Sequence, residues 1–215
     1  NNFLLNGKMV YCCSDSTVST VGSKSAEGKM SPRNMLTTTI GDELKIATDF
    51  KAKVIGVSLK DRAAILPAGH AADGAYWIDY STGTFISSTY YMKELPKWAV
   101  DYNKSIGKVT KDQICYTPLG NKITEEMAKA AVAGEQLGGD NVTDLLAVSF
   151  SCTDMIGHKY GTHSDKTREI YVDLDKRLAD LFGYLDQNVG KDQYLVFLMA
   201  DHGAANSILL SREHG

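Results

Sequence analysis

The chain carries the apolar run LLAVSFS at residues 145–151 and, one residue later, TDMIGHKYG at 153–161. An amphipathic segment follows, and then the run YLVFLM at 194–199 leads into DHG at 201–203. The apolar runs are typical of buried strands, and the spacing of the segment between them predicts a helix. A right-handed crossover makes two such strands parallel and close neighbours. The stretch therefore predicts strand, loop, helix, strand.

An Asp and a His follow each of these two strands. Asp154 and His158 come after the first strand, and Asp201 and His202 come after the second. The carboxyl ends of parallel strands share one rim, where open α/β folds bind ligands. Taken alone, the first pair favours an ordinary solvated loop. The second pair alone is a weak signal, and Asp201 could merely cap a following helix while His202 is exposed. Together, carboxylate oxygens and imidazole nitrogens suit Zn²⁺, and two pairs could serve two ions about 4 Å apart. We therefore expect a metal site at this rim.

A third apolar strand, residues 53–59, ends in charged residues. Lys60, Asp61 and Arg62 follow it directly. If the strand continues, residues 60 and 62 point to one side, so that both cations could reach one anion. The ammonium supplies a point charge and the guanidinium a fork, a reasonable clamp for phosphoryl oxygens. The competing interpretation is a surface patch in which Asp61 neutralises its neighbours.

The remaining pattern predicts an α/β layered domain with a mainly parallel sheet flanked by helices. Helices are predicted at residues 31–47, 124–137 and 164–188, the last with the apolar stripe of a helix packed on a sheet. Hairpins are predicted around residues 6–7 and 80–83. We expect one domain over residues 1–215, with a small β-rich subdomain or insertion at 63–104.

Composition excludes several partners. The 215 residues carry a net charge of −3, which gives no sign of a nucleic-acid partner. No apolar run approaches the roughly 20 residues of a membrane span.

The four cysteines, which lack the spacing of a zinc site, are expected to be isolated thiols: Cys12, Cys13, Cys115 and Cys152. The ends of the chain suggest an internal fragment.

Several long motifs point to one protein family. They are SPRN from residue 31, KDRAAILPAGH at 60–70, AYW at 75–77, STYYMKELP at 88–96, TDMIGHKYG at 153–161 and ADHGAA at 200–205. These motifs resemble the alkaline phosphatase superfamily, and most of all the phosphate-irrepressible alkaline phosphatases of Bacteroidetes, which are zinc enzymes with a Thr nucleophile. The resemblance covers essentially the whole chain.

The resemblance implies roles for the metal-type residues. Asp154 and His158 match two ligands of one zinc ion, and Asp201 and His202 match two ligands of the other. In that family the phosphoryl group passes to the Thr, and zinc-bound hydroxide then releases phosphate.

The resemblance also implies that Lys60 and Arg62 hold the non-bridging oxygens of a phosphate monoester. It further implies a periplasmic or secreted location. Such an enzyme acts on small phosphate monoesters.

Parts of the family pattern are missing. Nothing here fits the nucleophilic Thr or the first zinc-binding Asp, since residues 37–39 fall inside a predicted helix and not at its amino end. A further zinc-binding His lies beyond residue 215. Each zinc ion keeps two ligands, below the three or four that such sites need. We therefore expect an inactive fragment of a zinc phosphomonoesterase.

Two other functions remain open. One is a phosphodiesterase or sulfatase of the same superfamily, against which Lys60 with Arg62 argues, because a diester has one fewer charged oxygen to hold. The other is a non-catalytic binding domain that has kept the fold, for which retention of both cations gives poor support.

Overall fold

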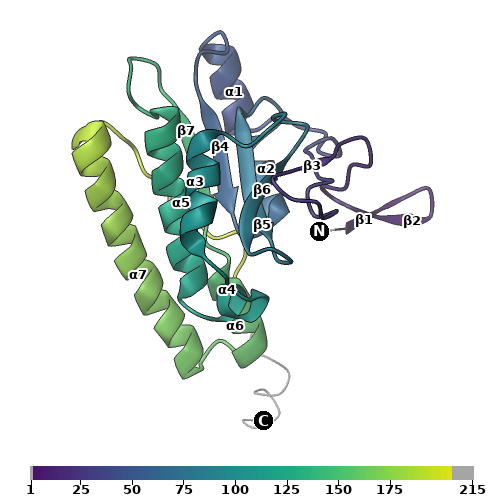
Figure 1. Cartoon of the computed structure of the whole chain (residues 1–215), viewed down its shortest axis with the longest axis vertical. Coiled ribbons are helices and arrows are strands. Elements are labelled where there is room, and N and C mark those ends of the chain that lie inside the picture. Colours follow the sequence, from purple (N-terminus) through teal and green to yellow (C-terminus); the bar gives the residue numbers. More distant parts are fainter. Residues whose placement is uncertain (1, 205–215) are drawn as a thin grey trace.

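The computed structural model describes residues 2–204, which are built around a five-stranded sheet in the order β3-β6-β5-β4-β7 (Figure 1). The strands are β3 (Thr20–Val21), β4 (Val54–Ser58), β5 (Gly74–Asp79), β6 (Thr84–Ser88) and β7 (Leu145–Ser149). β4 runs parallel to β5 and β7, whereas β3 and β6 are antiparallel to their neighbours. The predicted α/β class is confirmed. Both strands of the block at 63–104 belong to this sheet: β5 pairs with β4, and β6 pairs with β5.

Helices cover both faces of the sheet (Figure 1). They are α1 (Ile40–Ala47), α2 (Asp61–Ala68), α3 (Lys97–Ile106), α4 (Lys111–Tyr116), α5 (Leu119–Glu135), α6 (Cys152–Tyr160) and α7 (Asp165–Leu185), which ends in a π-helical turn, η1 (Asp186–Gly190). Side chains alternate along β5, so Trp77 packs with Ile65 of α2 while Tyr76 joins the core that includes Met127 of α5. In residues 2–204 no helix is both long and apolar enough to cross a membrane.

The helix α2 lies directly against β4. A Cβ atom added at Gly56 of β4 would lie 2.1 Å from the carbonyl oxygen of Ala64 and 3.1 Å from Cβ of Ala68. A side chain at this position would therefore force the helix away from the sheet. The absence of a side chain at Gly56 therefore sets how closely the middle and the end of α2 pack on β4.

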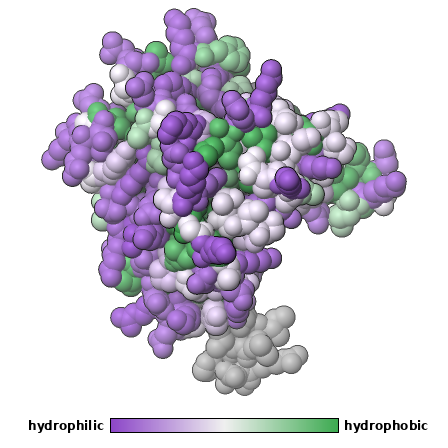
Figure 2. All heavy atoms as spheres, viewed as in Figure 1, coloured by the Kyte–Doolittle hydropathy of each residue, from purple (hydrophilic) through white to green (hydrophobic). Residues whose placement is uncertain are grey.

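The N-terminal hairpin projects from the body of the molecule (Figure 1). β1 (Asn2–Leu5) pairs antiparallel with β2 (Lys8–Tyr11), as the sequence predicts. Asn6 and Gly7 have φ of 50° and 76°, which suits a two-residue turn with both central residues left-handed. Its apolar side chains are largely exposed, with Leu4 at 70% (Figure 2).

The first helix begins later than predicted. Residues 31–39 are irregular, and α1 starts at Ile40, because Thr39 and Asp42 form a capping box. The Thr39 hydroxyl accepts from the Asp42 amide at 3.3 Å, and the Asp42 carboxylate accepts from the Thr39 amide at 3.0 Å. The irregular segment is held instead by buried Asp15, whose carboxylate accepts from the Ser31 hydroxyl at 2.6 Å.

The long helix α7 packs mainly on α5 and α6, and not on the sheet as its apolar stripe suggested. Buried Glu125 of α5 forms ion pairs with Lys129 at 2.5 Å and with Arg177 of α7 at 3.3 Å. Asn121 of α5 also donates to Asp173 of α7 at 3.1 Å. These polar contacts set how the two helices meet.

The predicted strand at 194–199 is not formed in the structure. Its apolar side chains are exposed, with Leu195 at 79% and Met199 at 82%. A buried-type strand needs cover on both faces. α2 and α5 reach as far as β7, while α7, the expected cover for the next strand, packs on α5 and α6. Within the described residues β7 is therefore the edge of the sheet, with β4 as its neighbour.

The predicted isolated thiols are confirmed for the part of the chain that the structure covers. All four cysteines there are free, and three of them are buried. Burial raises the pKa of the Cys152 thiol to about 12.

Candidate active site

The two strands that carry the predicted site residues end side by side. β4 and β7 pair in register up to Ser58 and Ser149. The Ser58 hydroxyl donates to the Ser149 carbonyl at 3.1 Å and lies 3.1 Å from the hydroxyl of Ser151. Both side chains are buried, so this contact ties together the two strand ends from which α2 and α6 begin.

The carboxylate of Asp154 is the centre of the cluster. Asp154 lies in the first turn of α6, and the Lys60 ammonium contacts its Oδ2. The Nε2 atoms of His158 and His202 lie 3.0 Å and 3.7 Å from its Oδ1. The predicted i, i+4 pairing of Asp154 with His158 on one helical face is thus confirmed. Burial alone would raise the pKa of Asp154, but the contact with Lys60 and the nearby imidazoles hold it below its ordinary value.

Arg62 is not directed at this carboxylate. The strand does not continue through these residues, because β4 ends at Ser58, Lys60 is the N-cap of α2, and Arg62 lies in the first turn of that helix. Arg62 Nη1 instead donates to the hydroxyl of Tyr11 at 3.4 Å, and that hydroxyl donates to Asp61 Oδ1 at 2.7 Å. Side chains two residues apart at a helix start do not face each other, so Lys60 and Arg62 contact different partners.

Asp201 also stands apart from the cluster. Its side chain is 94% exposed and lies 3.9 Å from Nε2 of His202. Across residues 2–204, no group of three or more His, Cys, Asp or Glu side chains has the arrangement that could hold a metal ion. The structure thus gathers Lys60, His158 and His202 on Asp154, and leaves Arg62 and Asp201 outside.

Some neighbours of the site were not foreseen from the sequence. Tyr11 closes a predicted hairpin some fifty residues before Arg62, so no local pattern links them. Thr39 was expected inside a helix, and the structure puts it at the amino end of α1. Its hydroxyl is engaged by Asp42, so it gives no sign of an attacking group.

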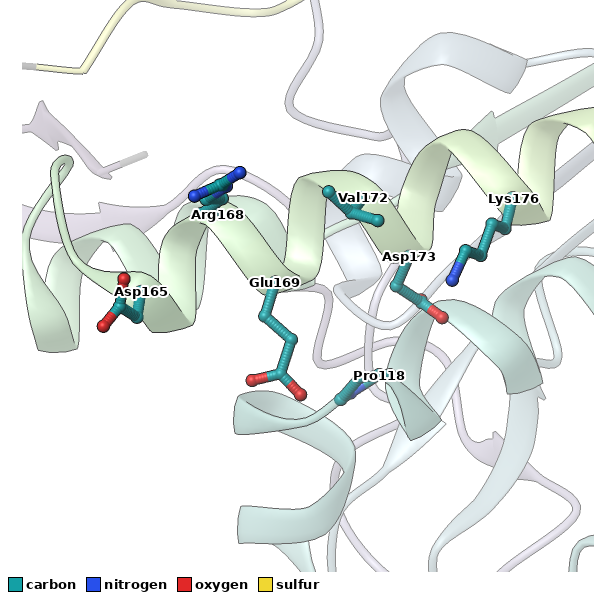
Figure 3. Close-up of a pocket in the computed structure, with 7 residues that line it drawn as sticks. All are labelled: Pro118, Asp165, Arg168, Glu169, Val172, Asp173 and Lys176. Atoms are coloured by element: carbon teal, nitrogen blue, oxygen red, sulfur yellow. The ribbon is translucent and has the colours of Figure 1, made fainter.

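A shallow groove lies elsewhere, between α7 and the start of α5 (Figure 3). Its lining residues are Pro118, Asp165, Arg168, Glu169, Val172, Asp173 and Lys176. Figure 3 shows Glu169 pointing to the side of the helix where Pro118 lies, whereas Arg168 points away from it. The lining carries charges of both signs and includes none of the predicted site residues.

Comparison with known proteins shows a family match that covers most of the chain. The family described as type I phosphodiesterase / nucleotide pyrophosphatase matches residues 30–208. The chain is 43% identical to alkaline phosphatase PafA of Elizabethkingia meningoseptica, over 97% of this chain and 47% of that protein. It is also 43% identical to alkaline phosphatase PhoV of Synechococcus elongatus, over 93% of this chain and 45% of that protein.

The fold agrees with the relationship to alkaline phosphatases that the sequence identities indicate. The crystal structure of wild-type alkaline phosphatase PafA superposes with a TM-score of 0.92 and 44% identity, covering 97% of this chain and 50% of that one. The chain spans about half the length of the relatives it matches. The resemblance identified from the sequence motifs is confirmed. The chain belongs to the type I phosphodiesterase / nucleotide pyrophosphatase family, within the alkaline phosphatase superfamily.

Proposed function

We propose that this chain is part of a zinc-dependent phosphomonoesterase that hydrolyses small phosphate monoesters through a phospho-enzyme. The observation that carries the proposal is the cluster on Asp154, where Lys60, His158 and His202 meet beyond the ends of β4 and β7. The proposal is supported by relatives that are named alkaline phosphatases.

The substrate would be held from the first turn of α2. Lys60 and Arg62 both start there, and they supply an ammonium and a guanidinium to the doubly charged phosphoryl group. A phosphodiester has one fewer charged oxygen, so two cations favour the monoester.

Four residues would hold the two zinc ions: Asp154, His158, Asp201 and His202. Their carboxylate oxygens and imidazole nitrogens are suitable zinc ligands, and both imidazoles lie near one oxygen of Asp154. Zinc, when bound, would supply Lewis-acid charge and lower the pKa of a water molecule. Two protein ligands per ion are fewer than such sites need. We therefore propose that the isolated chain is inactive and binds zinc weakly, and that the complete enzyme is periplasmic or secreted.

A phosphodiesterase is the second candidate, and the description of the matching family favours it. The two functions differ in the charge of the preferred substrate. A monoesterase should prefer p-nitrophenyl phosphate, and a diesterase should prefer bis-p-nitrophenyl phosphate.

The test measures zinc content and the turnover of both substrates in this chain and in the complete enzyme. We expect two zinc ions and monoester turnover in the complete enzyme, and neither in the chain alone. Lys60→Ala and Arg62→Ala should each raise the KM for the monoester, while Lys166→Ala should leave it unchanged, because that exposed side chain pairs only locally with Glu169. Zinc-dependent turnover by the chain alone would overturn the proposed incompleteness, and a preference for the diester would overturn the monoesterase.

A further inference from the structure

The hydroxyl of Tyr11 joins two charged side chains of α2. It donates to Asp61 Oδ1 at 2.7 Å and accepts from Arg62 Nη1 at 3.4 Å. Burial raises the pKa of Tyr11 above its ordinary value, so the hydroxyl stays protonated and keeps its role as a donor. Tyr11 is therefore the neutral link between the guanidinium and the carboxylate that follows Lys60 in the sequence.

Tyr11 is held in place by backbone hydrogen bonds and by packing against α2. Its carbonyl accepts from the Ser14 amide at 3.1 Å and from the Asn34 side chain at 3.4 Å. Two residues later, Cys13 is fully buried in the cluster that contains Ala64 and Ile65 of α2. The position of the hydroxyl is thus set by packing against the same helix that carries Arg62.

This arrangement leaves most of the guanidinium available. Arg62 has five N–H donors, and the contact with Tyr11 uses one of them. Among the ion pairs within residues 2–204, none involves Arg62, and the side chain is only partly exposed. A guanidinium whose long side chain is fixed at one nitrogen loses less rotamer freedom when it receives a bidentate oxyanion.

We propose that Tyr11 is a positioning residue for the phosphate-binding Arg62. Its hydroxyl holds one nitrogen of the guanidinium beside the first turn of α2 and leaves the other N–H donors for the phosphoryl oxygens. This inference rests on the proposed function, in which Arg62 holds the phosphate monoester. Tyr11 does not itself touch the substrate.

The test is a double-mutant cycle in the complete enzyme with Tyr11→Phe, Arg62→Ala and the double variant. The Phe ring keeps the packing and removes only the hydroxyl. We expect Tyr11→Phe to raise the KM for p-nitrophenyl phosphate and the inhibition constant of inorganic phosphate by about five- to tenfold, which corresponds to the net value of one ordinary hydrogen bond. kcat should change much less. In the Arg62→Ala background the same substitution should have no further effect.

Tyr91→Phe is the matched control. Tyr91 packs against the same cluster, and its buried hydroxyl has no hydrogen-bond partner among the described residues, so its loss should leave both constants unchanged. An equal loss from Tyr11→Phe with and without Arg62 would show a general structural role and overturn the inference, as would a silent Tyr11→Phe. If Arg62→Ala itself left both constants unchanged, the assignment of Arg62 as a phosphate ligand would fail, and this inference with it.

Discussion

Replacing Gly56 with Ala tests whether α2 is positioned by its contact with β4. The new Cβ would lie 2.1 Å from the carbonyl oxygen of Ala64 and 3.1 Å from Cβ of Ala68. Ordinary nonbonded contacts lie at about 3.5 Å or more, so the helix must move by roughly 1 Å. Overpacking of this kind should lower the free energy of unfolding by about 3 kcal/mol.

The displacement should also reach the site. Lys60 caps α2 and Arg62 lies in its first turn, so both cations move with the helix. A misplacement of about 1 Å can cost roughly 100-fold in rate. We therefore expect Gly56→Ala to lower kcat/KM of the complete enzyme for a phosphate monoester by about that factor.

The assay for stability is urea unfolding of this chain, followed by far-UV circular dichroism. Gly183→Ala is the control, because a Cβ at that position in α7 meets no atom within 4 Å. There the exchange should raise the free energy of unfolding by about 1 kcal/mol, the difference in helix propensity. Equal effects at the two glycines, or a Gly56→Ala chain as stable as the wild type, would refute the close packing of α2 on β4.

Three further predictions concern buried charges and thiols. Glu125→Gln removes the buried charge that Lys129 and Arg177 share, and it should lower the free energy of unfolding, measured in urea, by roughly 2 kcal/mol. The control Glu169→Gln, from an exposed pair with Lys166, should change it by under about 0.5 kcal/mol. Hydroxyl and amide donors outweigh burial and lower the pKa of Asp15 and Asp79 to about 2 from 3.8. Their contribution to stability is therefore complete above pH 4 and is lost as the pH falls toward 2, which acid titration of the unfolding midpoint measures; a flat profile there would contradict these pKa values. Cys152, with a pKa raised by burial to about 12, should resist iodoacetamide at pH 8 until the chain is unfolded, and rapid native labelling would contradict its burial.

The elements predicted well from the sequence are those whose signals are local. The apolar run at 145–149, the hairpin around Asn6 and Gly7, and the long stripe of α7 each carry their own period or turn chemistry. The start of α1 was missed because Ser31 and Pro32 look like a helix start, while the capping box at Thr39 decides it. The reciprocal hydrogen bonds between Thr39 and Asp42 outweigh the preference for a helix start at Pro32.

The site shows the same division between local and distant information. The i, i+4 spacing of Asp154 and His158 is enough to bring them together on α6. The approach of His202 to the same carboxylate depends on the path of the chain after α7, which no local spacing records. The link between Tyr11 and Arg62 depends on a hairpin packed beside α2, so only the folded structure reveals it.

The uncovered run 195–199 and the edge strand β7 have a consequence for the chain on its own. The run contains Leu195, Val196, Phe197, Leu198 and Met199, with no charge and no proline. Uncharged apolar segments next to unpaired backbone donors and acceptors favour pairing between separate molecules into extended sheets. Self-association should therefore compete with the monomer as concentration rises, and light scattering should grow more steeply than protein concentration. A charged residue placed at Phe197 should suppress this growth without altering the five-stranded core.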